Sequence, residues 1–250
     1  MTRKVRRVFI LISAAALAWV FFLAYRPLPP LGFVHSQYGD LVNAITVPER
    51  HITDAVSAVN FDVRAFDTLG EEFILFTSVM GVLVLMRRQS DEPAGHHEDK
   101  APGRTVPPAS DAVRVTALLL VAPAMLFGLY IVVHGQVSPG GGFQGGVILA
   151  SAPVLVYLCS EYAEFRRVLS MRLAEVSEAA GAATYILMGL VSLGLGGMFL
   201  ENLLPLGRSG TLTSGGMVPF IDVGVGLEVG GGLSLALLAY LEELVEEKEQ

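Results

Sequence analysis

HGQVSPGGGFQGGVILAS, residues 134–151, joins two hydrophobic segments through a run of glycines that follows a proline. The glycine motif within it consists of Pro139, Gly140, Gly141, Gly142, Gly145 and Gly146. A glycine costs a helix roughly 1 kcal/mol relative to alanine, but it permits backbone conformations and close approaches that no other residue allows. So many glycines at the start of an apolar segment predict a helix that packs closely against its neighbours or lines a pathway.

The composition predicts an all-α, polytopic membrane protein. The chain has 250 residues, of which 52% are hydrophobic and 16% are charged, whereas a soluble domain usually has about 25% charged residues. The net charge of −7 comes largely from the acidic C-terminal tail and the charged segment after residue 88, so it gives no reason to expect nucleic-acid binding. The single cysteine, Cys159, excludes an intrachain disulfide and a multi-cysteine metal cluster.

Six apolar segments predict transmembrane helices, and they cover residues 8–25, 68–86, 113–133, 145–160, 179–200 and 218–240. The first segment follows a basic start, as in a signal peptide, but it exceeds the roughly 7–15 residues of a signal-peptide core. We interpret it as an uncleaved helix, with a signal peptide as the alternative. Residues 47–59 are predicted to form a short amphipathic helix at the membrane surface.

The basic residues predict the orientation of these helices in the cell (inner) membrane. Thirteen of the 17 Lys and Arg residues fall in segments that lie on one side if the helices alternate in direction. Because basic residues concentrate in cytoplasmic segments, we expect both termini to be cytoplasmic and the glycine motif to lie at the outer side. Residues 89–104 are charged and contain prolines, which predicts a flexible cytoplasmic linker between two parts, residues 1–88 and 105–250.

Ionisable residues within membrane segments are costly and often mark ion paths. Glu228 lies about ten residues into the last segment, which places it roughly 15 Å deep. We consider it either a proton carrier or a structural carboxyl group that is hydrogen-bonded to a neighbour. Asp222 lies nearer the outer edge of the same segment, where a structural role is favoured.

Four further residues have both a structural and a functional interpretation. Glu71 and Glu72 fall in the first turn of a predicted helix, where the helix dipole favours acidic side chains. Asp67 can belong to a surface ion-pair group with Asp62 and Arg64. His134, at the end of a segment, is either a hydrogen-bonded interfacial histidine or a proton carrier.

No motif predicts an enzyme active site. Residues 140–145 formally match G-x-G-x-x-G, but the dinucleotide fingerprint requires a preceding strand, and here the run lies between membrane helices. Residues 142–146 and 226–230 match G-x-x-x-G, which is typical of contacts between membrane helices. We find no zinc signature, nucleophile elbow or phosphate loop, so we expect no catalytic residue, no cofactor and no bound metal.

Two regions resemble components of one family of complexes. The segment PGGGFQGG, the four predicted helices of residues 111–240 and the sequence FIDVGV at residues 220–225 resemble the B subunit of Mrp-type multisubunit Na+/H+ antiporters. Residues 59–85, VNFDVRAFDTLGEEFILFTSVMGVLVL, resemble the C-terminal end of the A subunit of these antiporters. In related membrane hydrogenases the equivalent piece is a small separate subunit.

The resemblance implies that the chain is a fusion of an A-subunit end with a B subunit. In this family the glutamate of FDTLGE is implicated in cation transport, which implies that role for Glu71, with Asp67 and Glu228 beside it on an ion path. The implied partners are other antiporter subunits, Na+, H+ and lipid. Two alternatives are the same module in a membrane hydrogenase or complex I-like redox complex, and a scaffold subunit that carries no ions.

Overall fold

The computed structural model describes residues 3–28, 36–86, 110–160, 165 and 169–246, and all regular elements among them are helical. The fold class is therefore all-α. In chain order the elements are α1 (Arg3–Tyr25), α2 (Gln37–Thr46), α3 (Ala55–Ala58), the π-helical turn η1 (Val59–Val63), α4 (Ala65–Leu85), α5 (Asp111–Val133), α6 (Gly142–Cys159), α8 (Met171–Gly194) and α9 (Val218–Glu246).

The chain divides into two compact units, Met1–Leu41 and Val42–Gln250. In the first unit, α1 carries exposed apolar side chains along its length, and Trp19 stacks on Phe22 with ring centroids 5.6 Å apart. The apolar part of α1, Ile10–Tyr25, is shorter than the 18 residues taken as the minimum length of a membrane span. The second unit contains the helices that reach this length.

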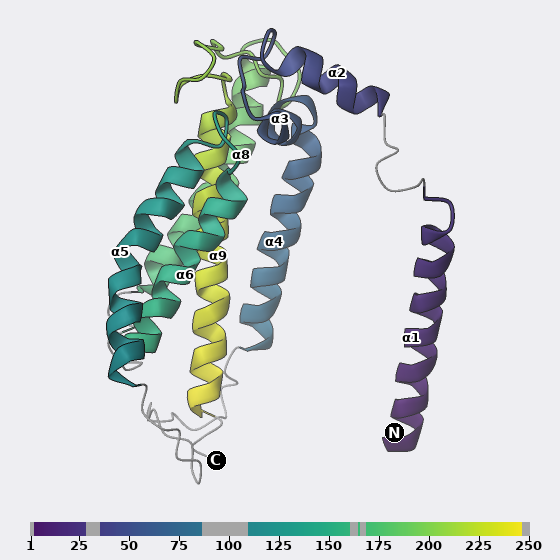
Figure 1. Cartoon of the computed structure of the whole chain (residues 1–250), viewed down its shortest axis with the longest axis vertical. Coiled ribbons are helices and arrows are strands. Elements are labelled where there is room, and N and C mark those ends of the chain that lie inside the picture. Colours follow the sequence, from purple (N-terminus) through teal and green to yellow (C-terminus); the bar gives the residue numbers. More distant parts are fainter. Residues whose placement is uncertain (1–2, 29–35, 87–109, 161–164, 166–168, 247–250) are drawn as a thin grey trace. The chain divides into compact units, whose positions relative to one another are not determined.

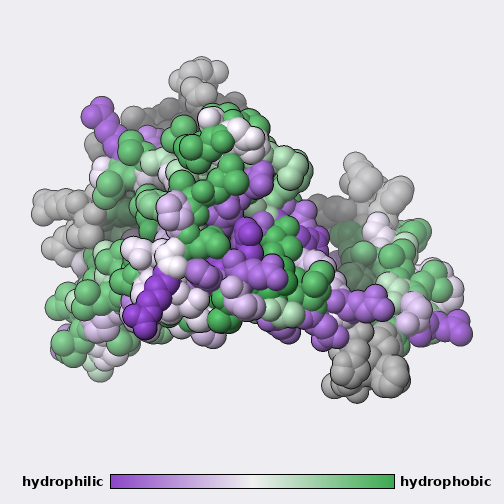
Figure 2. Space-filling model, turned by 90° about the horizontal axis from the view of Figure 1, so that it is seen from above, coloured by the Kyte–Doolittle hydropathy of each residue, from purple (hydrophilic) through white to green (hydrophobic). Residues whose placement is uncertain are grey.

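Five helices are long and apolar enough to cross a membrane: α4, α5, α6, α8 and the part of α9 that ends at Leu241. They confirm a polytopic membrane protein. Their outward faces are exposed and apolar, as Leu118, Leu119 and Leu126 of α5 illustrate, with 65–69% of each residue accessible. Seen from one end, hydrophobic residues lie around the edge and hydrophilic residues gather in the middle (Figure 2). This distribution suits a bundle that faces lipid.

Helix α9 is the centre of the bundle. It contacts α4, α5, α6 and α8. In α9, 67% of an 18-residue apolar stretch is buried within the protein, against 17–28% of the equivalent stretch in the other four helices. Successive long helices run in opposite directions, so α4, α6 and α9 begin at the end where α5 and α8 finish (Figure 1). The segment that links α5 to α6 lies at this end, together with α3 and residues 195–217.

The largest differences from the sequence predictions concern α8, which spans Met171–Gly194 and not residues 179–200, and the predicted surface helix. Helix α8 begins at Met171 instead of residue 179, because its first turns carry Arg172, Glu175 and Glu178 and are too polar for a hydropathy pattern to include. The predicted surface helix at residues 47–59 is wrong. Helix α2 ends at Thr46, His51 has a left-handed backbone with φ of 57°, and a new helix starts only after Asp54 accepts a hydrogen bond from the Ser57 N–H.

Candidate functional site

The glycine motif brings the start of α6 into contact with the backbone of α9. A Cβ atom on Gly142 would lie 2.5 Å from the carbonyl oxygen of Asp222 and 2.5 Å from Cβ of Val225. On Gly145 it would lie 2.4 Å from Cγ2 of Val132 in α5. No residue with a side chain fits at these distances, so glycine is what allows α6 to enter between α5 and α9.

Asp222 fastens α9 to the beginning of α6. Its side chain is fully buried, and Oδ1 accepts a hydrogen bond of 2.9 Å from the backbone N–H of Gly142. A carboxylate at this place satisfies a free N–H group and interacts favourably with the helix dipole. The second oxygen, Oδ2, lies against Gly135 and has no hydrogen-bond partner within the described residues.

The core of the bundle holds two carboxyl groups that face each other. Glu72 of α4 and Glu228 of α9 are 2% and 1% exposed, and their carboxyl groups lie side by side. In the part of the chain that the structure describes, none of their four oxygens accepts a hydrogen bond from a residue outside the pair. Two negative charges that are buried side by side repel each other and lack solvation. The arrangement therefore favours a proton or a cation held by the pair.

Helix α8 fixes the position of this pair. A Cβ on Gly181 would lie 2.4 Å from the backbone nitrogen of Glu228, so α8 rests directly on the turn that carries this glutamate. One turn further along α8, the hydroxyl of Tyr185 donates a 2.8 Å hydrogen bond to the carbonyl of Ala65 at the start of α4. The two contacts hold α4 and α9 at the spacing that brings Glu72 to Glu228.

The other predicted ion-path residues lie away from this pair. Glu71 and Asp67 are exposed on the outer side of α4, and Asp67 forms an ion pair with Arg64. His134 is partly exposed, and its Nδ1 lies 3.0 Å from the carbonyl oxygen of Tyr130, whose ring lies against the imidazole at a tilt of 30°. Only Glu72, Glu228 and Asp222 of the predicted set are enclosed by the bundle.

A cap, formed by residues 42–58 and 195–217, covers the end of the bundle where α9 begins. Ser57 donates a 2.6 Å hydrogen bond to the carbonyl of Gly135, and Thr53 donates one of 2.5 Å to the carbonyl of Val137. Gln136 donates to the carbonyl of Leu212 over 2.7 Å. The bonds of Ser57 and Thr53 attach the first predicted part to the glycine-rich segment of the second, and the bond of Gln136 joins two segments of the second part.

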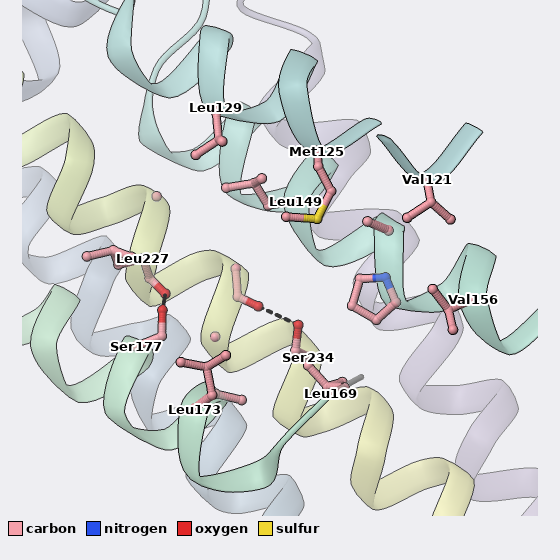
Figure 3. Close-up of a pocket in the computed structure, with 16 residues that line it drawn as sticks. Val121, Met125, Leu129, Leu149, Val156, Leu169, Leu173, Ser177, Leu227 and Ser234 are labelled. Carbon is pink, nitrogen blue, oxygen red and sulfur yellow. Dashed lines mark hydrogen bonds between the residues drawn. The ribbon is translucent and has the colours of Figure 1, made fainter. Parts of the chain in front are cut away.

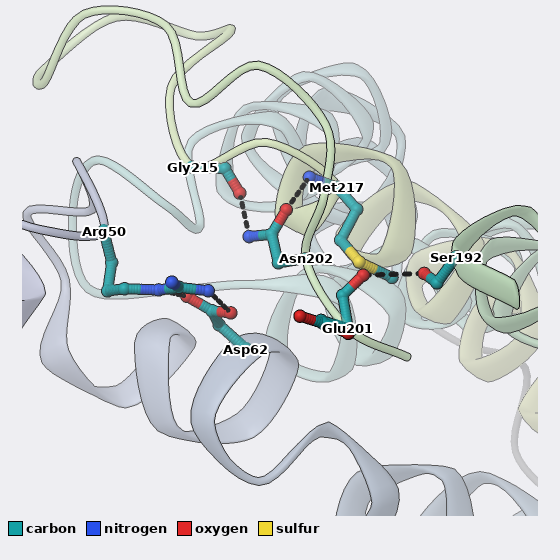
Figure 4. Close-up of polar contacts among 7 residues, drawn as sticks. All are labelled: Arg50, Asp62, Ser192, Glu201, Asn202, Gly215 and Met217. Atoms are coloured by element: carbon teal, nitrogen blue, oxygen red, sulfur yellow. Dashed lines mark hydrogen bonds and ion pairs between the residues drawn. The ribbon is translucent and has the colours of Figure 1, made fainter. Parts of the chain in front are cut away.

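Polar side chains hold the cap together (Figure 4). Arg50 makes two hydrogen bonds to the carboxylate of Asp62, and this contact raises the pKa of the guanidinium above its usual value. Asp62 thus pairs with Arg50 and not with the predicted Arg64 group. Asn202 donates to the carbonyl of Gly215 over 2.9 Å and accepts from the N–H of Met217 over 3.0 Å.

A separate cavity of about 340 Å³ lies between α5, α6, α8 and α9 (Figure 3). Its walls are mostly aliphatic, with Met125, Leu149 and Leu173 among the lining residues. The hydroxyl groups of Ser177 and Ser234 at its edge already donate to the carbonyls of Leu227 and Gly230. The hydrogens of both hydroxyl groups are therefore already engaged within the bundle.

Sequence reasoning missed Glu178 and Tyr185 of α8, both of which are buried. Glu178 was overlooked because the predicted segment started one residue after it. The buried residues of this helix recur every three or four positions, namely Ala174, Glu178, Gly181, Tyr185, Gly189 and Ser192. This helical period was the signal that marks one face of α8 as the inner face.

The fold is that of a multi-pass helical membrane protein. Residues 112–235 match the family model described as a domain related to the MnhB subunit of Na+/H+ antiporter. The part of the chain from α5 to α9 is therefore similar to this domain.

Two protein relatives extend this match. The B subunit of the Na+/H+ antiporter of Bacillus subtilis is 34% identical over 94 residues, which are 37% of this chain and 65% of that protein. An uncharacterized protein of Methanocaldococcus jannaschii is 28% identical over 233 residues and matches 86% of this chain and 87% of its own length. The second match thus includes most of the segment before residue 112.

Two solved structures share the fold over nearly the whole chain, and both are multisubunit membrane complexes. A chain of the membrane-bound sulfane sulfur reductase, an archaeal respiratory membrane complex, is 30% identical with a TM-score of 0.72, and the match covers 95% of this chain and 98% of that one. A chain of the Mrp complex from Dietzia sp. is 25% identical with a TM-score of 0.69, and the match covers 96% of this chain and 26% of that one.

Proposed function

We propose that this protein is a subunit of a multisubunit antiporter that exchanges a monovalent cation, Na+, for protons. Its part in transport is to hold a proton or cation at the Glu72–Glu228 pair and to join neighbouring subunits. The observation that carries the proposal is the burial of these two facing carboxyl groups without a hydrogen-bond donor from any other described residue. Carboxyl groups in such surroundings inside a membrane protein are typical of ion paths.

The geometry favours protons over a preformed metal site. Among the described residues, no group of three or more His, Cys, Asp or Glu side chains lies close enough to hold a metal ion. Sodium ions need several oxygen ligands, as hard cations do in general. We therefore assign proton transfer to the Glu72–Glu228 pair and place Na+ contacts at surfaces shared with partner subunits, where Glu71 and Asp67 are exposed.

The pair also connects the two predicted parts of the chain. Glu72 belongs to residues 1–88, which resemble an A-subunit end, and Glu228 belongs to residues 105–250, which resemble a B subunit. We propose that the site forms only when the two parts associate, which gives a physical reason to encode them in one chain. Asp222, six residues before Glu228 and thus about 9 Å along α9, is the next carboxyl group toward the cap.

The test compares Glu72→Gln and Glu228→Gln in the assembled complex. Sodium-dependent proton exchange is measured in inverted vesicles, and assembly is checked on a native gel. We expect each variant to assemble and to lose exchange by about tenfold or more, since a positioned proton carrier contributes at least that much. Glu175→Gln is the matched control, because Glu175 is exposed on α8.

Glu71→Gln tests the residue that the family resemblance selects, whereas Glu72→Gln and Glu228→Gln test the residues that the buried geometry selects. Loss of exchange in Glu72→Gln and Glu228→Gln establishes the buried pair, and loss in Glu71→Gln in addition places a second acidic residue on the path at the subunit surface. Normal exchange in both Glu72→Gln and Glu228→Gln contradicts the proposal and supports a scaffold subunit that carries no ions.

One observation favours a second function, the same module in a redox-driven membrane complex. The match to a chain of the sulfane sulfur reductase covers 98% of that chain, whereas the Mrp match covers only 26% of the matched chain. Purification of the native complex distinguishes the two functions. Copurified redox subunits, with ion transport that depends on an electron donor, support the redox complex, and antiport without them supports the antiporter.

A further inference from the structure

Glu178 is a buried acidic residue that the proposed pair does not use. It lies on the inner face of α8 and is 3% exposed, and its Oε1 has no hydrogen-bond partner within the described part of the chain. A buried carboxyl group in a membrane bundle is costly unless it is paired, protonated or used. Its surroundings therefore decide what it does.

The carboxyl group of Glu178 sits one helical turn beyond Glu228, on the side away from the cap. A Cβ on Gly232 would lie 3.1 Å from Oε1 of Glu178 and 3.1 Å from Cγ2 of Val79 in α4. Gly232 follows Glu228 by four residues, which is a rise of about 6 Å. The side chain of Glu178 thus lies between α9 and α4, in line with the Glu72–Glu228 pair.

Glycines create the space that this side chain occupies. A Cβ on Gly231 would lie 2.6 Å from the backbone nitrogen of Glu178, and one on Gly232 would press on its carboxyl group. Gly231 and Gly232 therefore let α8 approach α9 closely enough for Glu178 to reach the interior.

Among the described residues, the charged groups that act on Glu178 are all negative. Glu228 of α9 and Glu175 of its own helix are the two that influence it electrostatically, and α4 presents Val79 at this level. A carboxyl group that served as half of an ion pair would face an Arg or Lys. A carboxyl group that relays protons needs only a second carboxyl group within reach of one water molecule.

We propose that Glu178 is the next proton-carrying side chain after the Glu72–Glu228 pair, leading toward the end of the bundle where α8 begins. This inference rests on the proposed function. The step is a proton transfer through water: the O–H bond of protonated Glu228 breaks as a water molecule accepts its proton, and that water releases another proton to an ionised oxygen of Glu178. The charge moves by one turn of α9, and the water is regenerated.

The path then has three levels. Asp222 lies nearest the cap, the Glu72–Glu228 pair lies in the middle, and Glu178 lies beyond it. The basic residues of the sequence predict that the Glu178 end is cytoplasmic. A proton that leaves the pair on that side passes Glu178 before it reaches the end of the bundle where α8 begins.

The test uses three variants of α8 in the intact complex: Glu178→Gln, Glu178→Asp and the control Glu175→Gln. Sodium-dependent proton exchange is measured in inverted vesicles, with Glu228→Gln assayed in parallel. We expect Glu178→Gln to lower the rate of exchange by about tenfold or more. Glu178→Asp should recover part of this rate, and Glu175→Gln should exchange at the rate of the unmodified complex. The recovery by aspartate distinguishes proton transfer from packing, because aspartate restores the acid but not the side-chain length.

A second readout is the infrared spectrum of the carboxyl C=O stretch during a pH step. We expect a band of a buried protonated carboxyl group that Glu178→Gln removes and Glu175→Gln leaves unchanged. Loss of exchange in Glu228→Gln with normal exchange in Glu178→Gln overturns the role of Glu178 alone. Normal exchange in both variants overturns the proposed function as well. Equal loss in Glu178→Gln and Glu178→Asp, with an unchanged infrared band, shows a structural role for Glu178 and overturns the relay.

Discussion

Replacing Gly181 by alanine places a methyl group where α8 touches α9. The new Cβ would lie 2.4 Å from the backbone nitrogen of Glu228, 2.4 Å from the carbonyl oxygen of Gly224 and 2.7 Å from Cβ of Glu228. The first two are backbone atoms in the middle of α9, so they do not turn aside as the end of a side chain does. Non-bonded heavy atoms prefer about 3.5–4.0 Å, so the two helices must separate by about 1 Å.

Separating the two helices lowers the free energy of unfolding. Overpacking of a well-packed core costs about 1–3 kcal/mol, and each kcal/mol lowers the melting temperature of a protein of this size by about 2–4 °C. We expect Gly181→Ala to melt roughly 2–12 °C below the unmodified protein. The shift also moves the backbone of Glu228, so exchange activity falls although no carboxyl group has been removed.

The measurement is thermal unfolding of the purified complex in detergent, with the folded protein quantified by size exclusion after heating. Gly81→Ala is the matched control, since Gly81 lies within α4 and a Cβ there meets no atom within 4 Å. Alanine at such a place favours the helix by up to about 1 kcal/mol, so its melting temperature stays level or rises. Equal melting temperatures for Gly181→Ala and Gly81→Ala would refute the packing argument.

Three further changes test single contacts. Tyr185→Phe removes the buried hydrogen bond to Ala65 and should cost about 1 kcal/mol, seen as a lower melting temperature; an unchanged value means the bond contributes nothing. Asp222→Asn keeps an acceptor for the N–H of Gly142, whereas Asp222→Leu removes it. Only the leucine variant should therefore lower the free energy of unfolding, by about 1–3 kcal/mol, as measured by thermal unfolding. Arg50→Met strands the buried carboxylate of Asp62 and should destabilise the cap by about 1.5–3 kcal/mol, seen as faster cleavage by protease, with equal cleavage rates counting against the pair.

The membrane helices were predictable because their apolar runs are uninterrupted. The expected segment 113–133 corresponds to α5, Asp111–Val133, and segment 145–160 corresponds to α6, Gly142–Cys159. The start of α8 was not predictable from hydropathy, because its first two turns carry the charged residues Arg172, Glu175 and Glu178. The cap was not predictable either, since its shape depends on hydrogen bonds between residues far apart in the chain, such as Ser57 and Gly135.

The candidate site shows where sequence reasoning stops. Glu71 and Glu72 are adjacent and chemically equal, but successive residues of a helix point about 100° apart, so only one of them faces the core. The buried positions of α4 are Ala65, Thr68, Leu69, Glu72 and Val79, which form one helical face. This pattern selects Glu72, whereas the resemblance to FDTLGE selects Glu71. The contact between Glu72 and Glu228 joins residues 156 positions apart, and no local pattern contains it.

The glycine contacts limit how this bundle can move. Helices shear past one another when their side chains can repack from one groove to the next. At Gly142, Gly145 and Gly181 the backbones themselves touch, and a slide of one turn would drive Val225 or Val132 into a main chain. We therefore expect α6, α8 and α9 to stay fixed relative to one another during turnover. Rotation of carboxyl side chains and exchange of water molecules then suffice for proton passage, without the rocking of helices that alternating-access carriers use.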